Sequence, residues 1–100
     1  MPSLTSILTS HIAWSQKTFG SGRRTIGITK HIGKEVEEVI ANPTDLEEWI
    51  DIVILALDGA WRAGYTPEEI EAGLVKKIQT NRSRTYPHPT SEDEPSEHER

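Results

Sequence analysis

Apolar residues recur at helical spacing in four segments of the chain, separated by short stretches rich in glycine, proline and polar residues. The pattern predicts helices over about residues 4–17, 28–41 and 44–63, and a fourth that starts near residue 66. No segment alternates apolar and polar residues as a half-buried strand does. The connections are short, which favours antiparallel neighbours. The sequence therefore predicts an all-α fold, an antiparallel bundle of about four helices.

Helix ends are marked by residues that satisfy free backbone groups. Thr44 is placed to cap the third helix, and Glu47 completes a capping box there. Gly64 suits the left-handed residue that ends a helix. Thr66 and Glu69 form a second capping box at the start of the fourth helix. These signals predict where the last two helices begin and where the third ends.

The third helix is apolar over most of its circumference. Eight of the nine residues from Trp49 to Leu57 are apolar, and the exception is Asp51. The run is too short to span a bilayer, so no membrane partner is expected. A domain of 100 residues has little surface to cover such a helix, and burial against a second subunit is expected, in a homodimer or homotetramer. A carboxylate buried there is costly unless it is paired, and a bound metal ion is one such partner.

Two acidic pairs flank the predicted corner between the second and third helices. Glu35 and Glu38 form the first pair, and Glu48 and Asp51 form the second. Spacing of three residues puts both members of a pair on one helix face. Four carboxylates meeting in this way suit Mg²⁺, as a single ion or a cluster of two or three, and such sites serve phosphoryl chemistry. Each pair taken singly is also typical of a solvated helix surface, whereas an acid inside an apolar run favours function.

Further polar and aromatic residues are candidates for binding a substrate. Lys77, Asn81 and Arg84 are spaced four and three apart, so they can present donors to a polyphosphate from one helix face. An ordinary cationic helix C-terminus explains the same residues. His31 lies one turn before the first acidic pair. Trp14 can stack on a nucleobase, although a tryptophan at helical spacing is more often part of the core.

Composition narrows the possible functions. The net charge of −5 mostly describes residues 92–100, which hold five of the sixteen acids and one of the eleven basic residues. The rest is nearly neutral, which argues against nucleic-acid binding. The chain has no cysteine, so disulfides and thiolate metal sites are excluded. Nothing at the N-terminus resembles a signal peptide, and a cytoplasmic protein is expected. Residues 1–87 are predicted to form one domain, and 88–100 an acidic, disordered tail.

Three motifs carry a resemblance to a known family: EVEE at residues 35–38, EWID at 48–51 and KxxxNxxR at 77–84. Together they resemble the MazG-like all-α nucleoside triphosphate pyrophosphohydrolases. The strings HIxKE (31–35), DLEEWID (45–51) and DGAWRAG (58–64) are similar to a phage-associated branch described as dATP/dGTP pyrophosphohydrolases. The resemblance covers about residues 10–87.

The resemblance implies hydrolysis of a (deoxy)nucleoside triphosphate, with dGTP or dATP preferred, to the monophosphate and pyrophosphate. It also implies a helical dimer or tetramer in a cytoplasm, that of the host if a phage encodes the chain. Some relatives supply dGMP to phages that replace adenine with 2-aminoadenine. The residues implied in metal binding and catalysis, with Mg²⁺ or Mn²⁺, are Glu35, Glu38, Glu48 and Asp51. Those implied in phosphate or sugar binding are Lys77, Asn81 and Arg84, and Trp14 and His31 are further candidates for substrate binding.

Two other functions fit the same sequence. The chain can be a non-catalytic helical module that oligomerises or regulates a partner through its apolar third helix. It can also be a phosphatase that cleaves elsewhere along the phosphates, which would release orthophosphate instead of pyrophosphate. The acidic residues separate the first alternative from the enzyme, and product identity separates the second.

Overall fold

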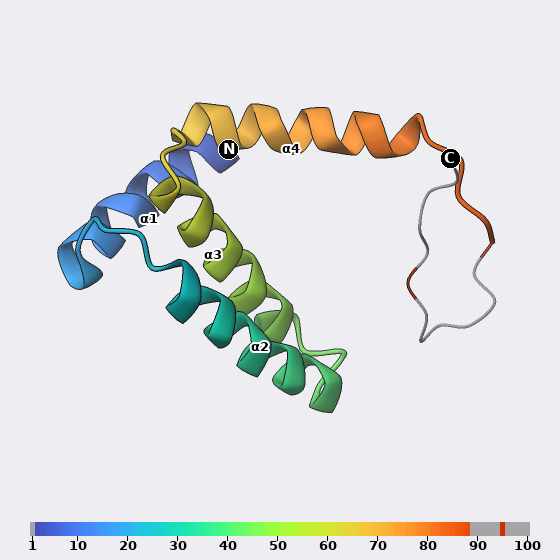
Figure 1. Ribbon diagram of the computed structural model, residues 1–100, viewed down its shortest axis with the longest axis horizontal. Helices are drawn as coiled ribbons and strands as arrows, with labels where there is room; N and C mark the ends of the chain where they lie inside the picture. Colours follow the sequence, from blue (N-terminus) through green and yellow to red (C-terminus); the bar gives the residue numbers. More distant parts are fainter. Residues whose placement is uncertain (1, 89–94, 96–100) are drawn as a thin grey trace. The chain divides into compact units, whose positions relative to one another are not determined.

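A computed structural model describes residues 2–88 and residue 95, and this part of the chain forms four helices and no strand. The helices are α1 (Leu4–Phe19), α2 (Thr25–Ala41), α3 (Leu46–Arg62) and α4 (Pro67–Arg82) (Figure 1). The predicted all-α fold is confirmed. The chain divides into two compact units, Met1–Ile70 and Glu71–Arg100.

Helices α2 and α3 form a tight antiparallel hairpin (Figure 1). Only residues 42–45 connect them, and backbone hydrogen bonds from Asn42 N to Glu38 O (2.9 Å) and from Asp45 N to Asn42 O (3.1 Å) close the corner. The predicted cap at Thr44 is wrong by one residue, because the Asp45 side chain accepts the Glu47 amide instead, at 3.0 Å. The short corner fixes which turns of α2 and α3 face each other.

The second helix begins three residues earlier than the sequence pattern predicts. Its first turn is closed by a hydrogen bond from Ile28 N to Arg24 O at 2.8 Å, so Thr25 is already helical. The third helix ends as predicted, with Gly64 at a φ of 113° after Arg62. A left-handed φ of this kind costs glycine little and suits the end of a helix.

The core of the first unit is small and lies where α1 and α2 pack against α3. Its buried apolar residues are Leu8, Ile28, Val39 and Trp61. At Gly59 the two hairpin helices come close, since a Cβ built there would lie 3.8 Å from the Ile28 Cγ2 atom. Trp61 is the largest side chain of this core.

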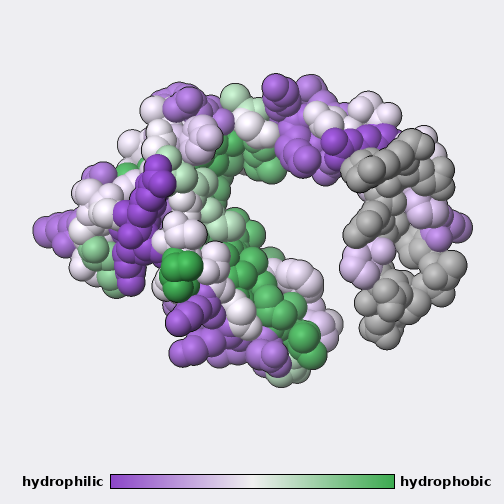
Figure 2. Space-filling model, viewed as in Figure 1, coloured by the Kyte–Doolittle hydropathy of each residue, from purple (hydrophilic) through white to green (hydrophobic). Residues whose placement is uncertain are grey.

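Much of the apolar surface of the hairpin faces outward. Trp49 is 50 % exposed and Val53 48 %, while Ile40 on α2 is 70 % exposed. Figure 2 shows a band of hydrophobic surface along the hairpin. Asp51 is exposed as well, so its expected burial is wrong for the single chain. The physical reason is that α1 and α2 cover only one side of α3.

Helix α4 begins as predicted and buries none of its residues. The Thr66 amide donates to the Glu69 carboxylate at 3.0 Å, and the Glu69 amide donates to the Thr66 hydroxyl at 3.1 Å, so the capping box is confirmed. Two apolar residues of α4, Leu74 and Ile78, are 51 % and 40 % exposed. The predicted tail over 88–100 lies, apart from two residues, outside the described part. None of the described helices is long and apolar enough to cross a membrane.

Candidate active site

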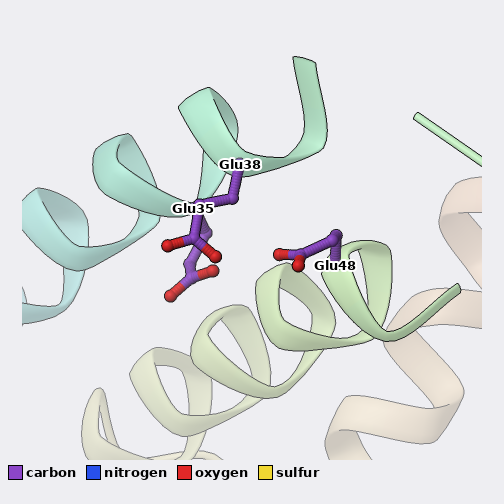
Figure 3. A group of neighbouring side chains, drawn as sticks. All are labelled: Glu35, Glu38 and Glu48. Carbon is purple, nitrogen blue, oxygen red and sulfur yellow. The ribbon is translucent and has the colours of Figure 1, made fainter. Parts of the chain in front are cut away.

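Three glutamates from the two hairpin helices meet next to the corner. Helix α2 contributes Glu35 and Glu38, one turn apart, and α3 contributes Glu48 from its first turn. One carboxylate oxygen from each lies within 4.8 Å of the other two. Figure 3 shows the three side chains extending into the space between the helices. We call these residues the acidic trio.

The trio is poor in donors. Glu35 Oε2 and Glu48 Oε2 are buried and have no hydrogen-bond partner among the described residues. The other Glu35 oxygen lies 3.1 Å from His31 Nε2. Partial removal from water raises the pKa of Glu48, and the hydrogen-bonding and negative charge of Glu38 raise it further. Crowded carboxylates with unpartnered oxygens are the arrangement that a bound cation relieves.

Asp51, the fourth predicted ligand, lies close to the trio. Its carboxylate oxygens are not among the atoms that lie within 4.8 Å of one another. Its negative charge contributes to the raised pKa of Glu48, after the contributions from burial, Glu38 and Asp45. It is exposed on α3, one turn beyond Glu48. The structure therefore brings three of the four predicted acids together and leaves Asp51 beside them.

A cavity of about 350 Å³ opens between α1, α2 and α3. One wall is aromatic: the Trp14 ring lies 5.9 Å from the His11 ring and meets the Phe19 ring edge-on at 5.7 Å. His31 lines the cavity from α2 and also contacts Glu35 of the trio, so the cavity and the trio adjoin each other. Two predicted substrate-binding residues, Trp14 and His31, thus line one cavity.

His11 is a cavity residue that the sequence reasoning missed. Its Nε2 atom is buried and lacks a hydrogen-bond partner within the described part of the chain. The nearest carboxylate oxygen is Asp58 Oδ1, at 3.7 Å. A polar atom left over in a cavity wall is available to a ligand. No motif around His11 indicates this role, because its partners come from another helix.

A buried polar network reaches the cavity through Ser15 and Asp58, which both line it. Asp58 Oδ1 accepts hydrogen bonds from Ser15 Oγ at 2.8 Å and Trp61 Nε1 at 2.7 Å, and Oδ2 accepts from Arg62 Nε at 3.0 Å. Burial alone would raise the pKa of Asp58, but these hydrogen bonds and the Arg62 charge outweigh it, and the pKa is lowered. Asp58 is therefore a paired, ionised carboxylate.

Asp58 lies ten residues beyond Glu48 on α3, and its network of donors sets it apart from the trio. The signal that indicates it is the spacing of Asp58 and Arg62, four residues apart within a helix. The partner on α1, Ser15, comes from 43 residues earlier in the chain, and only the tertiary fold reveals it.

The predicted phosphate-binding residues lie in the second unit. Lys77 and Asn81 are on exposed turns of α4, while Arg84 follows the end of that helix at Arg82. The three residues therefore do not share one helical face, which contradicts the prediction from their spacing. Their part in a site stays a prediction.

Comparison with known proteins decides the family. Residues 7–100 match the family of dATP/dGTP pyrophosphohydrolases, which is most of the chain. The chain belongs to this family. It is also 36 % identical over 92 residues to a protein named Eaa of Salmonella phage P22.

The match to Eaa covers 89 % of this chain and 28 % of the phage protein, so the chain spans less than a third of that relative. No solved structure matches the chain. Membership in the dATP/dGTP pyrophosphohydrolase family agrees with the resemblance found in the sequence, and the phage relative agrees with its phage-associated branch.

Proposed function

We propose that the chain hydrolyses a purine deoxynucleoside triphosphate, dGTP or dATP, to the monophosphate and pyrophosphate. The acidic trio carries the proposal, because it leaves two buried carboxylate oxygens unpartnered among the described residues. Family membership supplies the reaction class. The cavity beside the trio has the size and the aromatic wall that a nucleoside requires.

The residues present fit a divalent cation. Hard cations prefer carboxylate oxygens, and Glu35, Glu38 and Glu48 offer three from two helices. Asp51 can join them through a side-chain rotation or a bridging water, with two or three Mg²⁺ or Mn²⁺ ions per site. When bound, such ions polarise the phosphate and lower the pKa of a coordinated water. His31 holds the Glu35 carboxylate in place through their 3.1 Å contact.

The nucleoside part of the substrate occupies the cavity in this proposal. A purine ring stacks against Trp14, whose side chain remains 56 % exposed. The unpartnered Nε2 atom of His11 is available to hydrogen-bond the base. His31, between cavity and trio, lies beside the sugar and the α-phosphate. Attack at the α-phosphorus then requires the α-phosphate at the trio.

The remaining phosphates require cations or amide donors. Lys77, Asn81 and Arg84 supply them in this proposal. Substitution of each by alanine is expected to raise the KM of the triphosphate more than the dissociation constant of the nucleoside, because the lost contacts are to phosphates.

A second copy of the chain covers the apolar face of the hairpin in this proposal. Trp49, Val53 and Ile54 are all at least two-fifths exposed, and Ile40 extends the same apolar surface onto α2. Exposed apolar surface of this kind marks a protein interface. Sedimentation of the wild type and of Val53→Glu tests it: a dimer or tetramer is expected for the first and a monomer for the second.

A supply of dGMP for phage synthesis of a modified purine is the cellular role that we propose. It rests on the family and on the phage relative. A non-catalytic oligomerisation module remains the alternative, and its mark would be an oligomer that turns over no nucleotide.

Product analysis tests the proposed reaction. The protein is incubated with Mg²⁺, and separately with Mn²⁺, and with each common dNTP and NTP, and nucleotides and phosphates are separated. We expect dGMP and pyrophosphate from dGTP, formed faster than the products of pyrimidine nucleotides. Orthophosphate as the first product would contradict the cleavage position, and absence of turnover with either metal would favour the binding module.

A further inference from the structure

The buried Arg62 side chain links the third helix to the loop between α1 and α2. It is 1 % exposed, and all of its polar atoms are used. Its Nε atom donates to Asp58 and its Nη2 atom to Ser15 Oγ at 3.0 Å. Its Nη1 atom donates to two backbone carbonyls of the loop, Gly20 O at 2.9 Å and Gly22 O at 2.8 Å.

We propose that Arg62 is a positioning residue for nucleoside binding: by holding residues 20–24, it fixes the aromatic wall of the cavity. The inference rests on the proposed function, since it assigns the cavity to the nucleoside. Arg62 does not line the cavity and acts through the loop that it binds.

The loop is attached to the cavity at both of its ends. Phe19, the last residue of α1, precedes it, and Arg24 closes it before α2; both line the cavity. The Arg24 guanidinium lies 5.0 Å from the centre of the Phe19 ring, and that ring meets Trp14 edge-on. A shift of the loop therefore displaces Phe19 and Arg24 together and disturbs the surface against which a base would stack.

The chemistry of the link requires arginine. A planar guanidinium has five N–H donors in a fixed fork, so one side chain can bind a carboxylate, a hydroxyl and two carbonyls at once. Lysine keeps the positive charge beside Asp58 and cannot reach the same four acceptors with one ammonium group. Gly20 has a φ of 83°, a conformation that few other residues adopt, so the loop depends on both the glycine and the arginine.

The position of the network predicts which kinetic constant changes. The acidic trio is built from α2 and the first turn of α3, whereas Asp58 and Arg62 belong to the last turns of α3. Loosening of the loop should therefore weaken binding of every ligand that contains the nucleoside and leave the chemical step and pyrophosphate binding unchanged.

The decisive experiment is steady-state kinetics of Arg62→Lys with dGTP and Mg²⁺. We expect KM to rise about tenfold, since losing a hydrogen bond to a charged group corresponds to roughly that factor. The turnover number should stay within about twofold of the wild type. Inhibition by dGMP should weaken in parallel with KM, and inhibition by pyrophosphate should not change. A matched control is Arg23→Lys, the same exchange at an exposed loop arginine.

A double-mutant comparison shows whether Arg62 acts through the wall. If it does, Arg62→Lys adds little to the KM of Phe19→Ala, because the part that it positions is already missing. Fully additive effects, an unchanged KM, or equal loss of dGMP and pyrophosphate inhibition would each overturn the inference.

A milder variant tests the same link if Arg62→Lys has a folding defect. Ser15→Ala removes the hydroxyl that bridges Asp58 and Arg62 and retains both charges, and a severalfold rise in KM is expected. If Arg62→Lys does not unfold cooperatively, Ser15→Ala decides the question, and an unchanged KM there overturns the inference.

Failure of the proposed function gives a different result. If the wild type turns over no nucleotide, dGMP binding to the protein with its tryptophans unchanged is measured directly by isothermal titration calorimetry. Weaker dGMP binding by Arg62→Lys would still support the positioning role, whereas equal binding would overturn it.

Discussion

Two acids on the third helix, Glu48 and Asp58, are ten residues apart and have opposite environments. The pKa of Glu48 is raised and that of Asp58 is lowered. Burial acts on both in the same direction, so the difference comes from the neighbours. Asp58 accepts from Ser15, Trp61 and Arg62, while the neighbours of Glu48 are other acids.

The comparison separates a structural carboxylate from a ligand. A buried charge whose oxygens are already satisfied by protein donors stabilises the fold and has little left to offer a cation. A carboxylate with a free oxygen, crowded by like charges, costs stability until something positive binds. Position within one helix does not decide which of these roles a carboxylate has. The side chains that surround it do.

Removal of a trio carboxylate should have the largest effect on activity. Glu38→Gln and Glu48→Gln each delete one proposed ligand and relieve like-charge repulsion, so we expect turnover to fall by at least about a thousandfold while folding is retained. Product release and urea unfolding are measured on the same preparations. Asp51→Asn extends the series to the acid outside the trio. Variants that unfold without losing specific activity would show that these acids are structural.

Removal of Asp58 should have the largest effect on stability. Asp58→Asn leaves Arg62 buried and uncompensated, and breaking such a pair costs about 3 kcal/mol of the free energy of unfolding. Urea denaturation without metal measures it, with Glu47→Gln on the solvent side of α3 as the control. A loss as small as that of the control would mean that Asp58 is not the anchor of the network.

Acid should remove the stabilising contribution that Asp58 makes to the fold. The folded-state pKa of Asp58 is lowered, so its stabilising contribution is present above the unfolded value of about 3.9 and is lost as pH falls below it. Thermal unfolding from pH 6 down to pH 3 should show this loss in the wild type, and Asp58→Asn should show less of it. Equal slopes for the two proteins would contradict the assignment.

Mg²⁺ should have the smallest effect on stability and the clearest pH signature. A cation that binds only the folded trio stabilises it by about 1–3 kcal/mol at concentrations 10- to 100-fold above the dissociation constant. Because a proton on Glu48 competes with the cation and its pKa is raised, the increase in Tm should be greater at pH 8 than at pH 6. Glu48→Gln should abolish this pH difference.

The sequence was sufficient for the helices and for the trio. Periodicity located all four helices, and the spacing of Glu35, Glu38 and Glu48 around a short corner predicted that their carboxylates meet, as they do. These features depend on local geometry, which the chain order fixes directly. The cap at Asp45 in place of Thr44 shows the limit of such signals, since neighbouring polar residues can each serve.

Contacts between distant segments were beyond sequence reasoning. The link from Arg62 to the carbonyls of Gly20 and Gly22 involves backbone atoms that carry no sequence signal. Exposure of Asp51 depends on how much of α3 a single chain can cover. Both are tertiary outcomes, which local pattern does not determine.

The corner at residues 42–45 makes the site sensitive to insertions and deletions in this turn. Each residue added to a helix turns its faces by about 100° and advances it by 1.5 Å, so a single insertion absorbed into α3 would carry Glu48 to another side of the helix. Surface loops usually tolerate insertions and deletions. This four-residue turn should accept many substitutions and hardly any change in the number of its residues.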